Sequence, residues 1–125
     1  MKESVLSIIQ GLQPWEFKQP AGFTVRGYHS VPSGKPVLHF IHGNGFCGLT
    51  FERLLVEFQD DYDFFISDGQ GHGNSDEGEV YPGWNKSARN FERVWQHYSH
   101  LWANVPKIAL GHSYGAVMST LMMAK

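Results

Sequence analysis

A chain of 125 residues, 42% hydrophobic and 18% charged, has a globular composition and is long enough for one small domain with a core. Its formal net charge of −2 gives no basic field for nucleic acid. No apolar run approaches the roughly 20 residues that a membrane-spanning helix needs. We therefore expect a single domain over residues 1–125, with no nucleic-acid partner and no membrane span. The N-terminus lacks the apolar core of a signal peptide, and the one cysteine, Cys47, cannot form an internal disulfide, so the sequence favours the cytoplasm.

The first expected elements are a short helix over residues 4–12 and then a β-hairpin. Trp15 and Phe17 alternate with polar residues, Pro20-Ala-Gly22 supplies turn residues, and residues 23–26 alternate again. A period of two, interrupted by turn residues, is typical of an antiparallel hairpin.

The next stretch, Val37–Ile41, is almost continuously apolar. Such a run predicts a strand that is covered on both faces, as in a parallel sheet. His39 lies within it and is expected to be a hydrogen-bonded core histidine rather than a ligand. Beyond this strand, apolar residues recur at helical spacing and predict an amphipathic helix: Phe51, Leu54, Leu55 and Phe58.

A second buried strand is predicted at Phe64–Ile66. After a polar loop, apolar residues step by four and three over about five turns and predict a long amphipathic helix. These residues are Trp84, Ala88, Phe91, Trp95, Tyr98 and Trp102. A short buried strand, Lys107–Leu110, and a last helix, Ala116–Lys125, complete the chain. Alternation of strands and helices indicates an α/β fold, with an antiparallel hairpin leading into a mostly parallel sheet flanked by helices.

The turn between the last strand and the last helix carries the pattern Gly111-His112-Ser113-Tyr114-Gly115, which fits G-x-S-x-G. In the order strand, turn, helix this pattern predicts a nucleophile elbow, where a serine is lifted clear of the backbone. Glycines are needed at both flanks because side chains there would collide with the strand and helix. The alternative is an ordinary glycine-rich turn with an incidental serine, and this pattern alone does not separate the two.

Two further polar loops follow the two earlier buried strands. His42-Gly43-Asn44-Gly45 comes directly after the first, and Asp68-Gly-Gln-Gly-His-Gly-Asn-Ser75 comes after the second. In open α/β sheets, ligands bind outside the carboxyl ends of the strands, which is where these loops lie. A plain hairpin-like turn remains the alternative for residues 42–45, although the preceding buried strand favours a site loop.

Taken together, the three motifs resemble the N-terminal half of an α/β-hydrolase, of the branch that holds esterases, lipases, thioesterases and C–C bond hydrolases. Each motif alone is weak, but all three occur in the family's order, each after a predicted strand. The resemblance covers nearly the whole chain from about Phe23 onward.

The resemblance implies a role for each matching residue. Ser113 matches the nucleophile, and the backbone N–H groups of Asn44 and Tyr114 match the two donors of the oxyanion hole. The remaining matches imply support of the site loops: His42, Gly43, Gly45, Asp68, His72, Gly111, His112 and Gly115. No cofactor or metal is implied. His97 and His100 are three apart on a predicted helix, but a third ligand is missing nearby and a solvated face explains them better.

By this resemblance the protein is a serine hydrolase that acts on a carboxylic ester or related acyl substrate through an acyl-serine intermediate. The family's triad runs Ser, then Asp or Glu, then His. The twelve residues after Ser113 contain neither an acid nor a histidine. We therefore expect residues 1–125 to be a truncated α/β-hydrolase core whose catalytic acid and histidine lie outside it. The alternatives are a non-catalytic fragment or binding module, and an acyltransferase that uses the same site.

The resemblance also implies the order of the strands. In the family's sheet the strands present here lie in the order hairpin, fourth, third and fifth, so Lys107–Leu110 is an edge in this chain. An apolar edge strand is a template for association. We expect Val117, Leu121 and Met122 on the last helix to be partly exposed. The expected partners are accordingly a small-molecule acyl substrate and a second copy of the chain.

Overall fold

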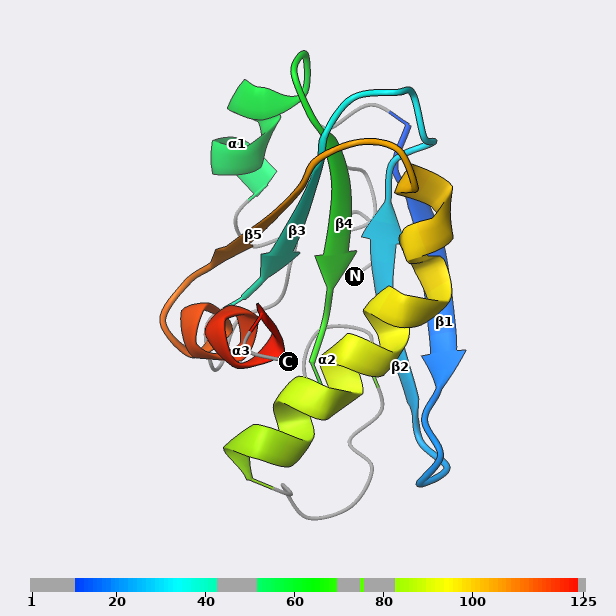
Figure 1. The fold of residues 1–125 in the computed structure, drawn as a ribbon, viewed down its shortest axis with the longest axis vertical. Coiled ribbons are helices and arrows are strands. Elements are labelled where there is room, and N and C mark those ends of the chain that lie inside the picture. The colour runs from blue at the N-terminus through cyan, green and yellow to red at the C-terminus, as the bar shows by residue number, and fades with distance from the viewer. Residues whose placement is uncertain (1–10, 43–51, 70–74, 76–82, 124–125) are drawn as a thin grey trace.

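The computed structural model describes residues 11–42, 52–69, 75 and 83–123. These residues form a five-stranded sheet in the order β1-β2-β4-β3-β5 (Figure 1). The strands are β1 Gln13–Lys18, β2 Thr24–His29, β3 Val37–Ile41, β4 Asp63–Ser67 and β5 Lys107–Gly111. This order confirms the one that the family resemblance implies, with β5 at an edge.

The sheet changes from antiparallel to parallel along its width. β1 pairs with β2 antiparallel, and β2 pairs antiparallel with β4. β3 lies parallel to β4 on one side and parallel to β5 on the other. Each parallel neighbour is reached through a helical connection, because the chain must return to the same end of the sheet.

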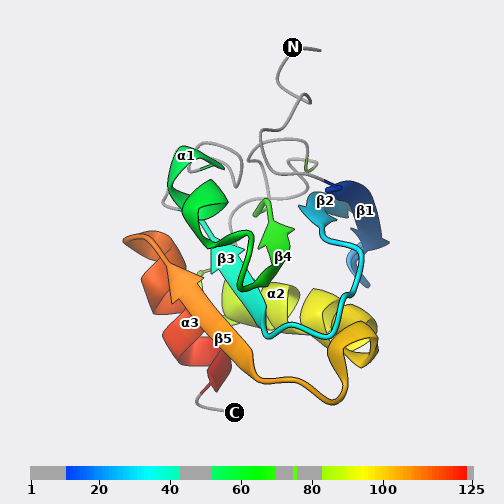
Figure 2. The ribbon, with the colours of Figure 1, turned by 90° about the horizontal axis from the view of Figure 1, so that it is seen from above.

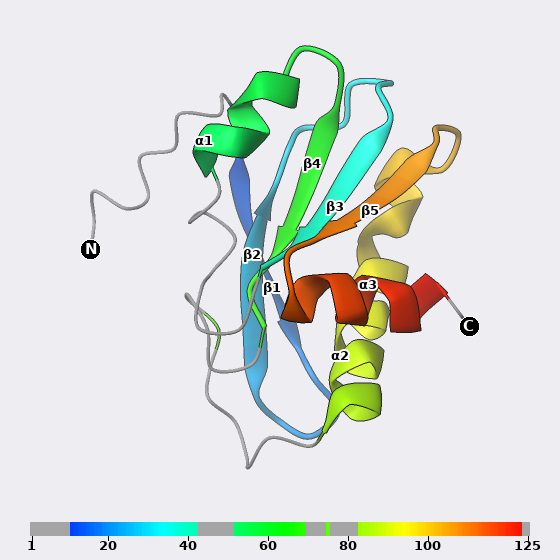
Figure 3. The same ribbon diagram turned by 90° about the vertical axis from the view of Figure 1, so that its left-hand side faces the viewer.

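Helices cover both faces of the sheet (Figures 2 and 3). α1 Glu52–Leu55 and the 3₁₀ turn η3 Val56–Phe58 lie on one face. α2 Trp84–Tyr98, which continues as the 3₁₀ turn η4 Ser99–Trp102, and α3 Tyr114–Met123 lie on the other. Within the described part of the chain, no helix is long and apolar enough to cross a membrane.

The two central strands, β3 and β4, are buried along their whole length. Successive side chains along these strands alternate between two core layers, one on each face of the sheet. On the α1 side, Leu38, Phe40 and Phe64 belong to one cluster. On the α2 and α3 side lie two clusters, one around Phe65 and Trp102 and the other around Ile41, Phe91 and Met118. Burial on both faces explains why these strands appear as continuous apolar runs.

A buried carboxylate fixes the end of the sheet away from the polar loops. The Asp63 side chain accepts hydrogen bonds from the Ser33 backbone N–H at 2.9 Å and the Ser33 hydroxyl at 2.7 Å. It also accepts one from Trp102 Nε1 at 3.0 Å. These bonds hold the loop before β3 and the end of η4 against the start of β4, so the charge is compensated by three donors.

Several expected elements need correction. Gly11 and Leu12 are not helical, and the rest of the helix expected over residues 4–12 lies outside the described residues. The amphipathic helix after β3 is only one turn of α-helix and one of 3₁₀-helix. Leu54 is 53% exposed and Phe58 38% exposed, so of these two apolar positions neither enters the core. The helical spacing of the apolar residues predicts which of them share a helix face, but it does not show whether another part of the protein covers that face.

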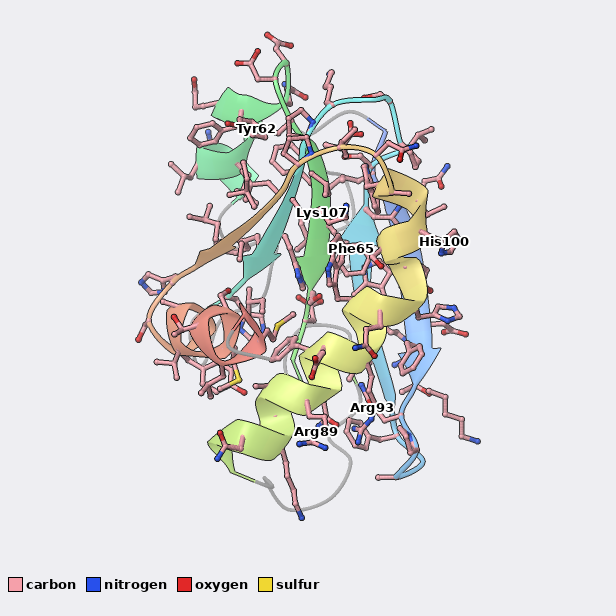
Figure 4. The ribbon with its side chains drawn as sticks, viewed as in Figure 1. Tyr62, Phe65, Arg89, Arg93, His100 and Lys107 are labelled. Carbon is pink, nitrogen blue, oxygen red and sulfur yellow. The ribbon has the colours of Figure 1, made fainter. Side chains whose placement is uncertain are left out.

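The last strand and helix also differ in detail from expectation. The apolar sequence of β5 predicts burial, but Lys107, Ile108 and Ala109 are exposed because no strand of the described chain lies beyond it. In Figure 4, which draws the side chains, Lys107 marks the start of this strand, and Arg89 and Arg93 mark α2. α3 begins at Tyr114, two residues earlier than predicted. Its Val117, Leu121 and Met122 are half-buried, as expected.

Candidate functional site

The turn between β5 and α3 is a strained strand-to-helix connection centred on Ser113. Among the described residues, Ser113 is the only non-glycine residue with a positive φ, at 55°. A side chain in this region of backbone space costs free energy unless the surrounding structure enforces it. The Ser113 side chain is exposed. The strained and exposed serine is the geometry that the elbow pattern predicts.

Two glycines allow this turn to pack against the sheet. A Cβ on Gly115 would overlap the carbonyl oxygen of Ile41 at the end of β3 and would lie 2.7 Å from the carbonyl oxygen of His42. A Cβ on Gly111 would overlap the backbone of Gly115. Both positions therefore require glycine for space rather than for a positive φ, since backbone atoms cannot move aside cheaply.

Backbone hydrogen bonds fix the elbow from both sides. The His112 N–H donates to the carbonyl oxygen of Ile41 at 3.2 Å, so the His112 backbone ties the elbow to β3. The Ser113 carbonyl oxygen accepts from the N–H groups of Ala116 at 2.9 Å and Val117 at 3.2 Å, which starts α3. Ser113 thus lies at the N-terminal end of a ten-residue helix, where the helix dipole favours negative charge.

His42 ties the loop after β3 to the loop after β4. Its side chain is fully buried, and its Nε2 accepts a 2.8 Å hydrogen bond from the Gly69 backbone N–H. The ring therefore acts as a structural acceptor at the carboxyl ends of two neighbouring parallel strands. A buried ring whose Nε2 accepts from the backbone makes His42 a structural contact between the ends of these two strands.

The loop that begins at Asp68 is closed by Ser75. The Ser75 hydroxyl donates to the Asp68 carbonyl oxygen at 2.7 Å and accepts from the Arg26 N–H at 2.7 Å. The Asp68 N–H donates to the Arg26 carbonyl oxygen at 3.0 Å, so both ends of the loop rest on β2. The sequence analysis assigned no role to Ser75 or Gly69. The feature that could have identified Ser75 is its position as the last residue of the motif that begins at Asp68.

Not every residue of the expected site is placed. Gly43, Asn44, Gly45 and His72 lie outside the described residues. Ser113, His112, Gly111 and Gly115 come together at the elbow, and Gly115 brings them against the His42 carbonyl. Asp68 is 4% exposed and joins the site region through the loop backbone. Tyr114 is half-buried and packs against the core cluster of Ile41, Phe91 and Met118.

Two other histidine environments differ from the one at the elbow. Burial lowers the pKa of His39 from 6.5 to about 3, so this ring is neutral at physiological pH. Its Nε2 lies 3.0 Å from the Ser67 hydroxyl and its ring stacks on Trp95, as expected for a core histidine. Among the described residues, the exposed His97 and His100 are not part of any group of three or more His, Cys, Asp or Glu suited to a metal.

Comparison with known proteins agrees with this architecture. The family model described as "Serine aminopeptidase, S33" matches residues 32–125. Among curated proteins, none matches this chain. Solved structures with similar folds include a thermostable carboxyl esterase from Bacillus coagulans, with TM-score 0.73 and 20% identity over 87% of this chain and 38% of the esterase.

Two further solved structures share this fold. An α/β hydrolase from Novosphingobium aromaticivorans has TM-score 0.75 and 16% identity over 90% of this chain and 39% of its own. A mutant of the haloalkane dehalogenase DatA from Agrobacterium tumefaciens has TM-score 0.62 and 12% identity over 72% of this chain and 30% of its own. The chain thus spans less than two fifths of each of these three structures. At such identities the likeness shows the fold, and the family match shows membership. The chain belongs to the serine aminopeptidase S33 family of α/β-hydrolases.

Proposed function

We propose that this chain carries the nucleophile of a serine hydrolase, with Ser113 as the attacking residue. The observation that carries the proposal is the backbone of Ser113, at a positive φ of 55°, exposed between two glycines that have no room for a side chain. A strained, exposed serine at a helix N-terminus has a structural cost and no packing benefit. Its presence at the carboxyl ends of the parallel strands favours a catalytic role.

The fold alone does not decide the reaction. An esterase and a haloalkane dehalogenase both share this architecture, so the chemistry depends on the residue at the elbow. A serine hydroxyl forms an acyl intermediate with a carboxylic ester or related acyl compound, and does not fit a route that needs a carboxylate nucleophile. We therefore infer a small acyl substrate rather than a halide or an epoxide.

The oxyanion of the tetrahedral intermediate would be stabilised by two backbone N–H groups. We assign these to Tyr114, the first residue of α3, and to Asn44, in the loop that follows His42. Fixed amides stabilise the developing charge without reorganisation during the reaction. The packing of Gly115 against Ile41 and the His42–Gly69 hydrogen bond support the proposal because they hold His42, two residues before Asn44, close to the start of α3.

A complete catalytic cycle needs a base and an acid from outside residues 1–125. In the proposed cycle a histidine takes the Ser113 hydroxyl proton as Oγ attacks the acyl carbon, and returns that proton to the leaving alcohol. Water, deprotonated by the same histidine, then attacks the acyl-serine, and the histidine passes this proton to Ser113 Oγ as the carboxylic acid leaves. A carboxylate beside the histidine orients its ring.

The cysteine count and the net charge support proposals about the cellular compartment and the partners of the protein. The single cysteine supports a reducing compartment, and we propose the cytoplasm. The net charge of −2 argues against nucleic acid. Besides the acyl substrate, we propose a second copy as partner only for the fragment of residues 1–125, through its elbow strand.

The test begins with the gene beyond codon 125. We expect an open frame that encodes a late Asp or Glu and then a His. A stop directly after Lys125 would favour a non-catalytic binding module. In the protein that carries these residues, Ser113→Ala should reduce hydrolysis of a p-nitrophenyl ester by at least about a thousandfold. Asn44→Ala is the matched control and should cost far less, because the donor proposed there is a backbone N–H. Activity of Ser113→Ala within a few-fold of the parent would overturn the assignment.

A further inference from the structure

A serine hydroxyl replaces one backbone hydrogen bond at each end of the β2–β4 pairing (Figure 1). At one end, the Ser30 N–H donates to the Phe64 carbonyl oxygen at 2.9 Å, but the Phe64 N–H donates to the Ser30 hydroxyl at 2.8 Å. At the other end, the Asp68 N–H donates to the Arg26 carbonyl oxygen at 3.0 Å, but the Arg26 N–H donates to the Ser75 hydroxyl at 2.7 Å. Each end therefore has one direct bond and one bond to a serine hydroxyl, where a regular antiparallel pair exchanges two direct bonds.

The two serines are equally buried but lie at opposite ends of β4. Both are 9% exposed. The Ser30 hydroxyl contacts the start of β4, away from the carboxyl ends of the strands. The Ser75 hydroxyl donates to the Asp68 carbonyl oxygen, just after β4 ends, at 2.7 Å. Ser75 Oγ also lies 3.3 Å from the Arg26 carbonyl oxygen, but the shorter contact takes the single hydroxyl proton.

One peptide group connects Ser75 to His42. The Asp68 carbonyl and the Gly69 N–H belong to the same planar peptide group. Its oxygen accepts from the Ser75 hydroxyl, and its N–H donates to His42 Nε2 at 2.8 Å. Four groups thus follow one another head to tail: the Arg26 N–H, the Ser75 hydroxyl, the Asp68–Gly69 peptide group and the His42 ring. Hydrogen bonds in such a chain polarise one another, so loss of the Ser75 hydroxyl weakens the bond to His42.

We propose that Ser75 is a positioning residue for the oxyanion hole. This deepens the proposed function, on which it rests. His42 precedes by two residues Asn44, whose N–H is the proposed donor, and the His42 carbonyl oxygen lies against Gly115 of the elbow. Because the peptide group is planar, the Ser75 bond to its oxygen fixes the direction of the N–H that holds the His42 ring. The Ser75 hydroxyl therefore sets the orientation of His42 and, through it, the start of the loop that carries Asn44.

The burial of this hydrogen-bond chain makes a single hydroxyl matter. His42 is fully buried and Asp68 is 4% exposed, so solvent water does not readily replace a lost bond. The oxyanion forms only as Ser113 attacks, so a displaced donor lowers the rate of the chemical step rather than the affinity for substrate. Displacement should cost less than complete removal of an oxyanion donor, which lowers the rate by about a hundredfold or more.

The first experiment compares Ser75→Ala with Ser30→Ala in the protein that carries residues 1–125 together with the downstream acid and histidine. Both substitutions remove an equally buried hydroxyl from the β2–β4 pairing, so Ser30→Ala controls for a general loss of stability. Ser75→Ala should lower kcat for a p-nitrophenyl ester about tenfold and leave KM within about twofold of the parent value. Ser30→Ala should leave both constants near those of the parent. An unchanged kcat in Ser75→Ala, or equal kcat losses in the two variants, would overturn the proposal.

The second experiment follows the Gly69 amide and needs no enzyme activity. With glycine selectively isotope-labelled for NMR, hydrogen exchange of the Gly69 N–H should be at least about tenfold faster in Ser75→Ala than in Ser30→Ala. Ser75→Cys keeps the size of the side chain but offers only a weak donor, so it should also speed this exchange and serves if the alanine variant does not fold. Exchange as slow in the Ser75 variants as in Ser30→Ala would overturn the role of Ser75.

Failure of this inference can be told apart from failure of the proposed reaction. Full ester turnover by Ser113→Ala would refute the proposed nucleophile. Unchanged Gly69 exchange in the Ser75 variants, with Ser113 still acylated, would refute only the positioning role of Ser75.

Discussion

The Nε2 atom of His42 accepts a 2.8 Å hydrogen bond from the backbone N–H of Gly69. His42 follows β3 and Gly69 follows β4, which are parallel neighbours in the sheet. A fully buried side chain therefore links the two loops that the family resemblance places beside the nucleophile. Since Nε2 accepts, the proton of the neutral ring is on Nδ1.

Removal of this acceptor should destabilise the protein. His42→Ala leaves the buried Gly69 N–H without an acceptor and opens a cavity, so we expect a loss of about 2–4 kcal/mol in the free energy of unfolding. His42→Gln is the matched control, because its side-chain oxygen can accept a similar bond, and it should lose clearly less. Urea denaturation of the three proteins measures both values. Equal losses for alanine and glutamine would show that the hydrogen bond contributes little.

The space at Gly115 predicts a strong effect of a branched side chain. Gly115→Val would push α3 away from β3, since its Cβ overlaps the Ile41 carbonyl, and should cost over about 2 kcal/mol. Ala116→Val, one residue further along the same helix, introduces the same side chain at an exposed position and should cost well under about 1 kcal/mol. Chemical denaturation compares them. A loss below about 0.5 kcal/mol for Gly115→Val contradicts the described packing.

The backbone of Ser113 predicts that its side chain lowers stability. Glycine adopts a positive φ without steric cost, so Ser113→Gly should be more stable than Ser113→Ala by about 1 kcal/mol. Alanine keeps the Cβ and serves as the control for loss of the hydroxyl. A thermal melt of both variants decides the matter. Equal stability, or a more stable alanine variant, would mean that the turn is not strained at Ser113.

The buried His39 predicts a pH dependence of stability. Its pKa is about 3 in the folded protein against 6.5 ordinarily, so its neutral ring stabilises the fold fully above pH 6.5. As pH falls from 6.5 toward 3, the unfolded chain gains a proton that the folded chain does not. This one group should therefore reduce stability by up to about 1.4 kcal/mol per pH unit. Below pH 3 its contribution stops changing.

Comparison with His39→Gln isolates this group from the other titrating residues. Unfolding free energies measured at about pH 7 and about pH 5 should fall more steeply for the parent than for the variant. Parallel pH profiles would show that His39 does not titrate between the folded and unfolded states.

The sequence predicted the parts of the fold that local patterns encode. Continuous apolar runs marked β3 and β4 because both strands are buried on two faces, and the glycines at 111 and 115 marked the elbow because backbone contacts leave no room for a Cβ. Contacts between distant residues could not be found in this way. The His42–Gly69 bond joins positions 27 apart and the Asp63–Trp102 bond joins positions 39 apart, and neither follows from periodicity. The exposure of Leu54 likewise depends on the absence of an opposing surface among the described residues, which spacing does not reveal.

The central claim is that Ser113 becomes acylated, and mass spectrometry of the intermediate tests it most directly. The protein that carries residues 1–125 together with the downstream acid and histidine is mixed with a p-nitrophenyl ester and quenched in acid within one turnover. Trypsin releases Ser113 in a peptide that begins at Ile108, because Lys107 precedes it. We predict an acyl adduct on Ser113 that is absent from the Ser113→Ala variant. Ester hydrolysis with the adduct on another residue, or with equal turnover in the Ser113→Ala variant, would contradict the account.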